Sequence, residues 1–248
     1  TDGAGMYIEH HHWHSPSLGS TINIKQYGRE GEPILAFPTD FGSFDEWEQH
    51  GMVDAISYQI ENGFNALFTT ETLDQESFLE SDIEPKLRLM RYLQYEQYVL
   101  DELLPLIRKE NRTDGYIILA GTGFGAFHAA NLIFKHPGHF DKIIGLDGLY
   151  DISGYLDDFY DDLVYFNNPL HFLPKTRDQK LIDKMNNLDI HLVSSNTNPD
   201  FTDHTQQLSD VLRSIMVDHI LDQKVEELDS NFESEWEYWA DALKRHII

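Results

Sequence analysis

The chain has 248 residues, of which 18 are Lys or Arg and 43 are Asp or Glu, so its formal net charge is 18 − 43 = −25. Protonation of all 13 His would still leave −25 + 13 = −12, which excludes nucleic acid and anionic membranes as expected partners because their phosphates would be repelled. Hydrophobic residues make up 41% of the chain, enough for a sizeable core. The absence of cysteine excludes disulfides, thiolate metal sites and a Cys nucleophile.

The first five residues read TDGAG and precede Met6. We interpret residues 1–5 as a remnant of an expression vector and residues 6–248 as a single domain. No cleavable signal pattern follows Met6, and no apolar run approaches the roughly 20 residues of a membrane-spanning helix. We therefore expect a soluble, cytoplasmic protein.

Segments with β character alternate along the chain with longer segments of helical period. The predicted strands cover residues 21–27, 33–37, 64–69, 116–120, 142–146 and 190–194, and the predicted helices cover residues 86–109, 125–135, 202–215 and 235–246. Such alternation predicts a mainly parallel sheet with helices on both faces. Two acidic clusters, residues 151–162 and 222–237, fall in predicted loops or exposed helix faces, as either a solvated surface or a docking surface for a basic partner.

The most informative segment is residues 116–126, in which a buried-strand run enters the glycine-rich turn GTGFG and then a helix. A strand, a sharp G-x-S-x-G turn and a helix together form a nucleophile elbow, but its central position here is Gly123. The alternative is an ordinary glycine-rich turn, with or without an anion at the helix N-terminus. A phosphate-binding loop or dinucleotide fingerprint does not fit the spacing.

Further motifs occur in order along the chain: HSPSLG at 14–19, FPT at 37–39, YEQYVL at 95–100, GAFHAAN at 125–131, HP at 136–137 and YFNNP at 165–169. From Tyr7 onward the sequence resembles the α/β-hydrolase "Putative esterase" family related to esterase D. The resemblance implies a three-layer α/β/α sandwich with a mainly parallel sheet, and relatives that are serine hydrolases acting on esters without a cofactor.

The resemblance also implies a catalytic triad in the chain order Ser, Asp, His, and this sequence departs from it at all three positions. Gly123 takes the place of the nucleophile. Asn198 precedes a proline after the late strand, where relatives carry the acid, and Ser234 opens the last helix, where relatives carry the base. If this alignment holds, Gly123, Asn198 and Ser234 should meet at one crevice.

These replacements predict the loss of the family's covalent chemistry. Glycine has no group to attack a carbonyl, asparagine cannot stabilise an imidazolium by charge, and a serine hydroxyl cannot accept a proton as imidazole does. We therefore expect a pseudoenzyme that acts by binding an unknown protein or small molecule. The alternative is a hydrolase that uses a non-standard nucleophile, such as Thr122, or a metal-bound water.

A retained ligand crevice would be lined by Thr39, Asp40, Thr122, Phe124 and Asp147. Asp40 lies in the loop that normally supplies an oxyanion donor, or else it faces solvent or caps a turn. Asp40, Asp147 and Asp200 could together form an acidic pocket for a cation, or they are separate loop carboxylates. His128 is interpreted as a hydrogen-bonded packing residue.

The histidine-rich segment near the N-terminus is the second constellation. His10, His12 and His14 would share one face of an extended segment, as candidate metal ligands or as an adventitious binding surface. We expect no physiological metal there. Homo-oligomerisation is left open because Trp236, Tyr238 and Trp239 would suit either self-association or a docked terminal helix.

Overall fold

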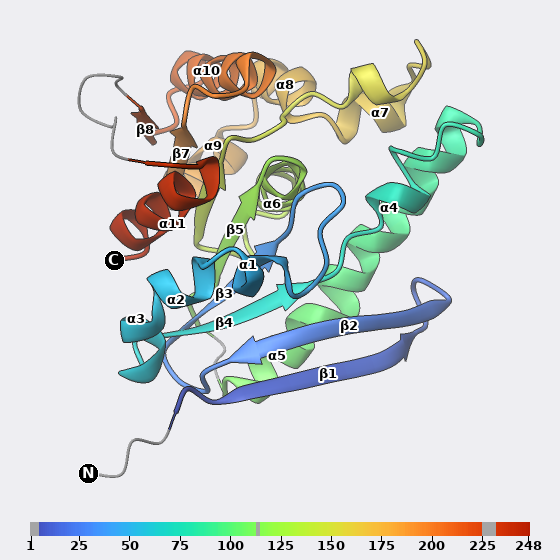
Figure 1. Cartoon of the computed structure of the whole chain (residues 1–248). Coiled ribbons are helices and arrows are strands. Elements are labelled where there is room, and N and C mark those ends of the chain that lie inside the picture. The colour runs from blue at the N-terminus through green and yellow to red at the C-terminus, as the bar shows by residue number, and fades with distance from the viewer. Residues whose placement is uncertain (1–4, 113–114, 225–231) are drawn as a thin grey trace.

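The computed structural model describes residues 5–112, 115–224 and 232–248. Within these residues the chain forms an eight-stranded sheet of order β1-β2-β4-β3-β5-β6-β7-β8 (Figure 1). The strands are β1 (Ile8–Ser15), β2 (Ser20–Tyr27), β3 (Glu32–Phe37), β4 (Asn65–Thr70), β5 (Ile118–Thr122), β6 (Lys142–Leu146), β7 (Asp189–Ser194) and β8 (Ile220–Gln223).

The sheet is parallel from β4 to β8 and antiparallel at the β1 and β2 edge. β3 lies between β4 and β5, and Ile34 of β3 is paired with Leu67 of β4 on one side and with Ile118 of β5 on the other. β1 and β2 form a hairpin that continues the sheet antiparallel to β4. This arrangement confirms the predicted mainly parallel α/β architecture.

Helices cover both faces of the sheet. They are α1 (Glu46–Gln49), α2 (Met52–Ala55), α3 (Ser57–Glu61), α4 (Pro85–Tyr98), α5 (Leu104–Glu110), α6 (Phe124–Lys135), α7 (Asp162–Phe166), α8 (Pro169–Phe172), α9 (Gln179–Asn186), α10 (Pro199–Ser214) and α11 (Glu235–His246), with 3-10 turns η1 (Asp74–Glu76), η3 (Ser153–Tyr155) and η4 (Leu173–Lys175). None of the helices in the described ranges is long and apolar enough to cross a bilayer.

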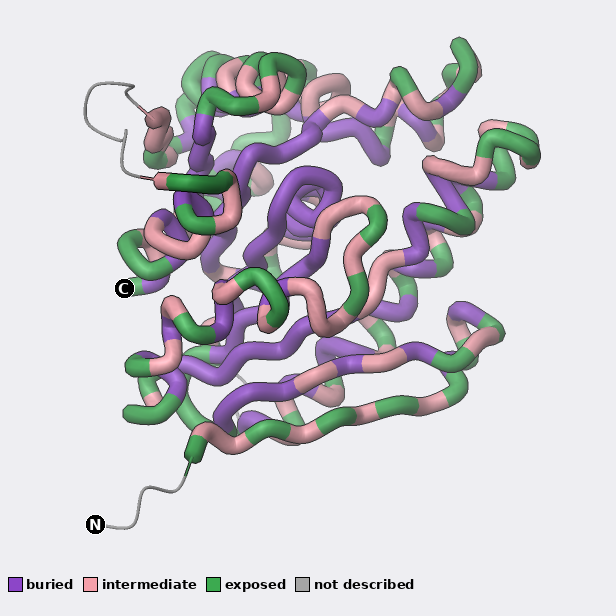
Figure 2. The backbone as a smooth tube through the Cα atoms, in the orientation of Figure 1, coloured by how far each residue is buried: buried purple, intermediate pink, exposed green. Residues whose placement is uncertain are grey.

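Alternate residues of the central strands face opposite cores, as the two-residue period of a strand requires. Ile118 and Ile144 pack with α2 and α11 on one face, whereas Leu119 and Ile143 pack with α4, α5, α6 and α10 on the other. In Figure 2 the central strands and α6 are buried, and many exposed residues lie on the outer helices, on β1 and on the connecting loops. The sheet with its two helical layers is the predicted three-layer sandwich.

The predicted helix at 86–109 is interrupted by a π-helical turn, η2 (Val99–Leu103), between α4 and α5. Pro105 follows this turn after one residue, Leu104. Proline lacks an N–H and its ring clashes with the carbonyl four residues earlier, so the wider turn accommodates it without ending the helix. The periodicity predicted the helix but gave no sign of the register change.

The six predicted strands are observed with small shifts at their ends, the largest being 116–120, which is observed as Ile118–Thr122. The sequence analysis did not predict the two edge strands, β1 and β8. β1 occupies the histidine-rich segment, and β8 lies at the start of the second acidic cluster. The remainder of that cluster includes residues 225–231, which lie outside the described residues.

Candidate functional site

The glycine-rich turn connects the end of β5 to the first residue of α6. Gly123 lies at its apex with φ +57° and ψ −114°. The Gly123 N–H donates to the Leu146 carbonyl at 3.0 Å, and its carbonyl accepts from the Leu149 N–H at 3.2 Å, so the turn is fastened to the segment after β6. Such a positive φ is strained for a residue with a side chain and free for glycine. The strand, turn and helix have the arrangement of a nucleophile elbow.

The three glycines of the turn are present for different reasons. A Cβ on Gly121 would lie 2.2 Å from the Gly125 backbone, and one on Gly125 would lie 2.3 Å from the Phe37 carbonyl oxygen, so both must be glycine. A Cβ on Gly123 would meet only the Phe201 ring, at 3.6 Å, which is an ordinary van der Waals distance. The apex therefore has room for a Cβ atom that this chain does not supply.

The residue in front of the apex, Phe201, comes from the first turn of α10. Asn198 is the N-cap of that helix, and its side-chain oxygen accepts hydrogen bonds from the N–H groups of Asp200 at 3.0 Å and Phe201 at 3.4 Å. Asn198 thus has a capping role, which an asparagine performs well. The structure brings Gly123 and the Asn198 segment together through Phe201.

Ser234 is the N-cap of α11, and its Oγ accepts a hydrogen bond from the Glu237 N–H at 3.3 Å. It lines a cavity of about 180 Å³ with Ser195, Thr197, Lys224, Phe232, Glu233, Glu235 and Tyr238. Neither Gly123 nor Asn198 is among these lining residues. Ser234 is therefore connected to the Asn198 segment through Ser195 and Thr197, but the structure does not show the three predicted triad positions meeting in one cavity.

Asp147 follows β6 and is almost fully buried, with only 2% of its surface exposed. Its Oδ1 accepts from the Ser195 N–H at 2.7 Å, and its Oδ2 accepts from Trp239 Nε1 at 2.6 Å. Both carboxylate oxygens are thus engaged by the protein, and they connect β6 to the end of β7 and to α11. This geometry favours a structural role over the predicted role in a ligand crevice.

The loop after β3 holds the other two polar crevice candidates. The backbone N–H and the hydroxyl of Thr39 both donate to the Glu46 carboxylate, at 2.8 and 2.5 Å. Partial burial raises the pKa of Asp40, and the nearby charge of Asp74 raises it further. Asp40 is therefore not a fully solvated loop carboxylate.

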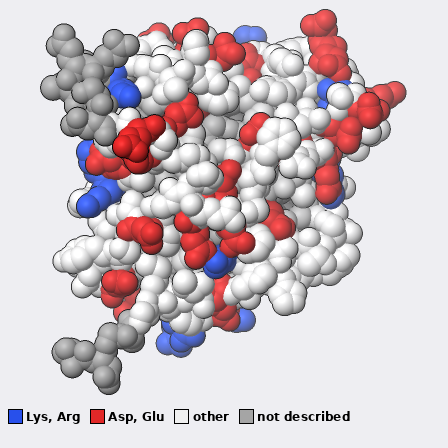
Figure 3. Space-filling model, in the orientation of Figure 1, with Lys and Arg blue, Asp and Glu red and all other residues white. Residues whose placement is uncertain are grey.

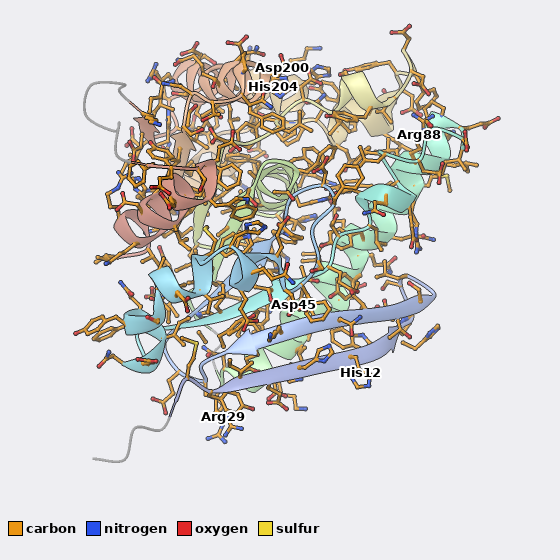
Figure 4. All side chains as sticks on the ribbon, in the orientation of Figure 1. His12, Arg29, Asp45, Arg88, Asp200 and His204 are labelled. Carbon is orange, nitrogen blue, oxygen red and sulfur yellow. The ribbon has the colours of Figure 1, made fainter. Side chains whose placement is uncertain are left out.

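Three carboxylate charges act on Tyr155 near the elbow, and they are not the same three that the sequence analysis considered as an acidic pocket. Burial raises the pKa of Tyr155, and the charges of Asp40, Asp200 and Asp74 raise it further. This set contains Asp74, whereas the set considered from the sequence contained Asp147. Asp200 lies on α10 beside His204, as Figure 4 shows. Tyr155 also packs edge-on against Phe124, with ring centroids 5.0 Å apart.

Asp74 forms a buried hydrogen bond that the sequence did not indicate. Its Oδ1 lies 2.8 Å from His128 Nε2, and both side chains are at most 2% exposed. The prediction that His128 is a hydrogen-bonded packing residue agrees with this contact. Asp74 itself carried no signal, because its partner lies 54 residues away and no motif joins them.

His10, His12 and His14 do lie on one exposed face of β1. The His10 and His12 rings are 5.7 Å apart between centroids, and His10 stacks on Phe44 while its Nε2 lies 2.9 Å from the Asn23 side-chain oxygen. Among the residues that the structure describes, no group of three or more His, Cys, Asp or Glu side chains is placed to hold a metal ion.

The sequence model of the family described as "Putative esterase" matches residues 47–248 of the chain. The chain therefore belongs to this esterase family. A search of curated proteins finds no match.

Solved structures agree with the family assignment at the level of the fold. A ferulic acid esterase superimposes with a TM-score of 0.76 at 14% identity, covering 97% of this chain and 96% of its own. An S-formylglutathione hydrolase from Agrobacterium tumefaciens gives a TM-score of 0.77 at 11% identity, covering 100% and 95%. A fluorophosphonate-binding serine hydrolase from Staphylococcus aureus gives 0.68 at 11% identity, covering 98% of both chains.

In this esterase-family member, two of the predicted crevice residues beside the apex are inaccessible. Thr122 is fully buried, and its Oγ1 has no hydrogen-bond partner among the described residues. A hydroxyl without solvent access cannot attack an ester, so the geometry argues against Thr122 as a nucleophile. Phe124 is 2% exposed and belongs to an aromatic cluster with Phe78, Tyr92 and Phe127.

Proposed function

We propose that this member of the esterase family does not cleave esters by the covalent mechanism and acts instead by binding a ligand or partner. The observation that carries the proposal is Gly123 at the apex of the elbow. The turn keeps the backbone geometry in which a nucleophile is presented, with space for a Cβ atom, and contains no atom that could attack.

The environment of the apex supports the same conclusion. Phe201 lies against the position that a nucleophile would occupy, and Asn198 caps the helix that carries Phe201. Ser234 caps α11 and does not share a cavity with Gly123. Neither Asn198 nor Ser234 can act as a base at neutral pH. Asn198 and Ser234 therefore each stabilise the N-terminus of a helix.

The electrostatics near the elbow also oppose ester hydrolysis. An oxyanion intermediate needs hydrogen-bond donors and positive potential where negative charge develops. Here the negative charges of Asp40, Asp200 and Asp74 act on Tyr155, whose ring packs against Phe124 of the turn. Figure 3 shows acidic side chains scattered over the viewed face, with few basic ones between them. This field favours a neutral or cationic ligand over a developing anion.

A fluorophosphonate reaction on the purified chain tests the proposal. An activated serine displaces fluoride from such a probe and forms a phosphonyl adduct that intact-mass spectrometry detects. We expect no adduct on the wild-type chain under conditions that label the Staphylococcus aureus fluorophosphonate-binding hydrolase completely. Stoichiometric labelling of the wild type would overturn the proposal.

The Gly123→Ser variant is the matched control for the apex. It places a hydroxyl at the elbow, but Ser234 supplies no imidazole to take its proton. We therefore expect labelling slower than that of the active hydrolase by a factor on the order of 10⁴. Ester turnover by the wild type that a chelator abolishes, without labelling, would also contradict the proposal and would favour a metal-bound water.

A further inference from the structure

A cavity of about 410 Å³ lies at the C-terminal end of α6, the opposite end of this helix from the elbow. We call it the α6 C-terminal cavity. It is lined by Phe134, Lys135, His136, Tyr165, Phe166, Phe172, Lys175, Thr176, Arg177, Asp178 and Leu181. Its volume is in the range of small-molecule sites.

The walls of this cavity are apolar. Phe134 is buried in the core at its base, and Tyr165, Phe172 and Leu181 are half-buried around it. Phe166 stands at its edge with 58% of its surface exposed, which is high for a phenylalanine. Such a surface binds an aromatic ring or an alkyl chain by removing apolar area from water.

The rim of the cavity carries positive charge on a chain of net charge −25. The Lys175 Nζ lies 5.1 Å from the centre of the Tyr165 ring, and Arg177 Nη1 donates to the backbone carbonyls of Pro174 at 3.0 Å and Thr176 at 2.8 Å. These contacts hold both cations at the rim. Across the described residues, no carboxylate lies within ion-pair distance of either cation.

The other charged side chains of the cavity make contacts within the protein. Lys135 Nζ donates to Glu96 Oε2 at 2.5 Å and to the Asn167 side-chain oxygen at 2.6 Å. The Asp178 carboxylate caps α9 by accepting from the Lys180 N–H at 2.9 Å, and it keeps its negative charge because this donor is neutral. Among the lining residues without an ion-pair partner, the two positive charges of Lys175 and Arg177 exceed the one negative charge of Asp178.

We propose that the α6 C-terminal cavity binds a small amphipathic anion, an organic carboxylate with an aromatic or alkyl body. The apolar body lies against Phe166, Phe172 and Leu181, and the carboxylate pairs with Lys175 and Arg177. Arginine suits this position because its planar guanidinium can donate two parallel hydrogen bonds to a carboxylate. The site is separate from the elbow, so its test does not depend on the proposed function.

Isothermal titration calorimetry with phenylbutyrate and its neutral isostere phenylbutanamide tests this site. We expect the carboxylate to bind about tenfold more tightly than the amide at low ionic strength, and this ratio to fall with added salt. The double variant Lys175→Gln/Arg177→Gln should reduce phenylbutyrate affinity to that of the amide and leave amide binding unchanged.

The double variant Lys180→Gln/Lys184→Gln is the matched control, since it makes the same change in net charge at exposed positions of the adjacent α9. It should preserve the preference for the carboxylate. Phe166→Ser, at an exposed position, should weaken both probes. Absence of phenylbutyrate binding, equal binding of the two probes to the wild type, or loss of the preference in the control would each overturn the proposal.

Discussion

The two ends of α6 show how one buried helix separates two kinds of surface. Eleven of its twelve residues are buried, so the helix meets possible ligands only near its ends (Figures 1 and 2). At the N-terminal end Phe201 lies against the glycine turn, and carboxylate charges act on Tyr155, which packs on Phe124. At the C-terminal end an apolar cavity is bordered by Lys175 and Arg177. The family's catalytic position and the site with free cations are thus at opposite ends of the helix.

The pKa values of carboxylates are also shifted in opposite directions at the two ends of α6. Near the elbow, burial and the charge of Asp74 raise the pKa of Asp40. At the other end, burial opposes the ionisation of Glu96, but hydrogen bonds from His136 and Lys135 and their positive charges hold its pKa below the usual value. The comparison shows that an acidic chain can still hold a local surplus of cations.

The largest expected effect concerns the packing of the elbow. Gly125→Ala would force a Cβ to within 2.3 Å of the Phe37 carbonyl oxygen, so backbone must move. We expect a loss of about 3 kcal/mol or more in the free energy of unfolding, measured by urea denaturation. Gly138→Ala, just beyond the other end of α6 with nothing within 4 Å of the added Cβ, should change stability by less than about 0.5 kcal/mol. Equal effects would contradict the elbow packing.

The next effect concerns Asp147. Asp147→Ala removes the acceptor for two buried donors, the Ser195 N–H and Trp239 Nε1, and places alanine at a φ of +45°. We expect a loss of about 3 kcal/mol in the free energy of unfolding. Asp147→Asn keeps one acceptor and tolerates this φ, so about half that loss is expected. An alanine variant as stable as the wild type would show that Asp147 does not connect α11 to the sheet.

The smallest effects concern pH, and they have opposite signs at the two ends. The pKa of Asp40 is higher in the folded state than in the unfolded state, so protonated Asp40 contributes to the free energy of unfolding. This contribution is fully present at a pH below the unfolded-state pKa and is lost as pH rises through the folded-state pKa. Asp40→Asn should therefore stabilise the neutral-pH protein, by less than about 1 kcal/mol because Asp40 is partly solvated.

Glu96 provides the matched comparison. Its lowered folded-state pKa means that its contribution is present above the unfolded pKa and is lost as pH falls through the folded pKa. Glu96→Gln should destabilise the protein at neutral pH by about 1–3 kcal/mol, because Lys135 loses its partner, and the difference should shrink in acid. Urea denaturation between pH 3 and 8 measures both variants, and pH effects of the same sign would refute the comparison.

The sequence predicted the central part of the fold because buried parallel strands read as short apolar runs between helical segments. β8 was missed because it has four residues, none fully buried, within an acidic segment. β1 was considered only through its alternating histidines. Edge strands carry weaker hydrophobic patterns than central ones, so local sequence identifies them less well.

The candidate site was predictable where its signal is local. Gly123 was identified because the whole turn lies within a few residues. The role of Asp147 was not, because its partners Ser195 and Trp239 lie 48 and 92 residues further along the chain. Phe201 was likewise invisible, since nothing in the sequence of α10 indicates that its first turn packs against the elbow.

The π-helical turn between α4 and α5 also determines how the N-terminal hairpin is anchored. Glu102 lies in this turn, and its carboxylate accepts hydrogen bonds from Trp13 Nε1 at 2.7 Å, Ser15 Oγ at 2.8 Å and the Ser17 N–H at 3.0 Å. The carboxylate of one residue in this irregular turn therefore holds strand β1 and its loop against the body of the protein.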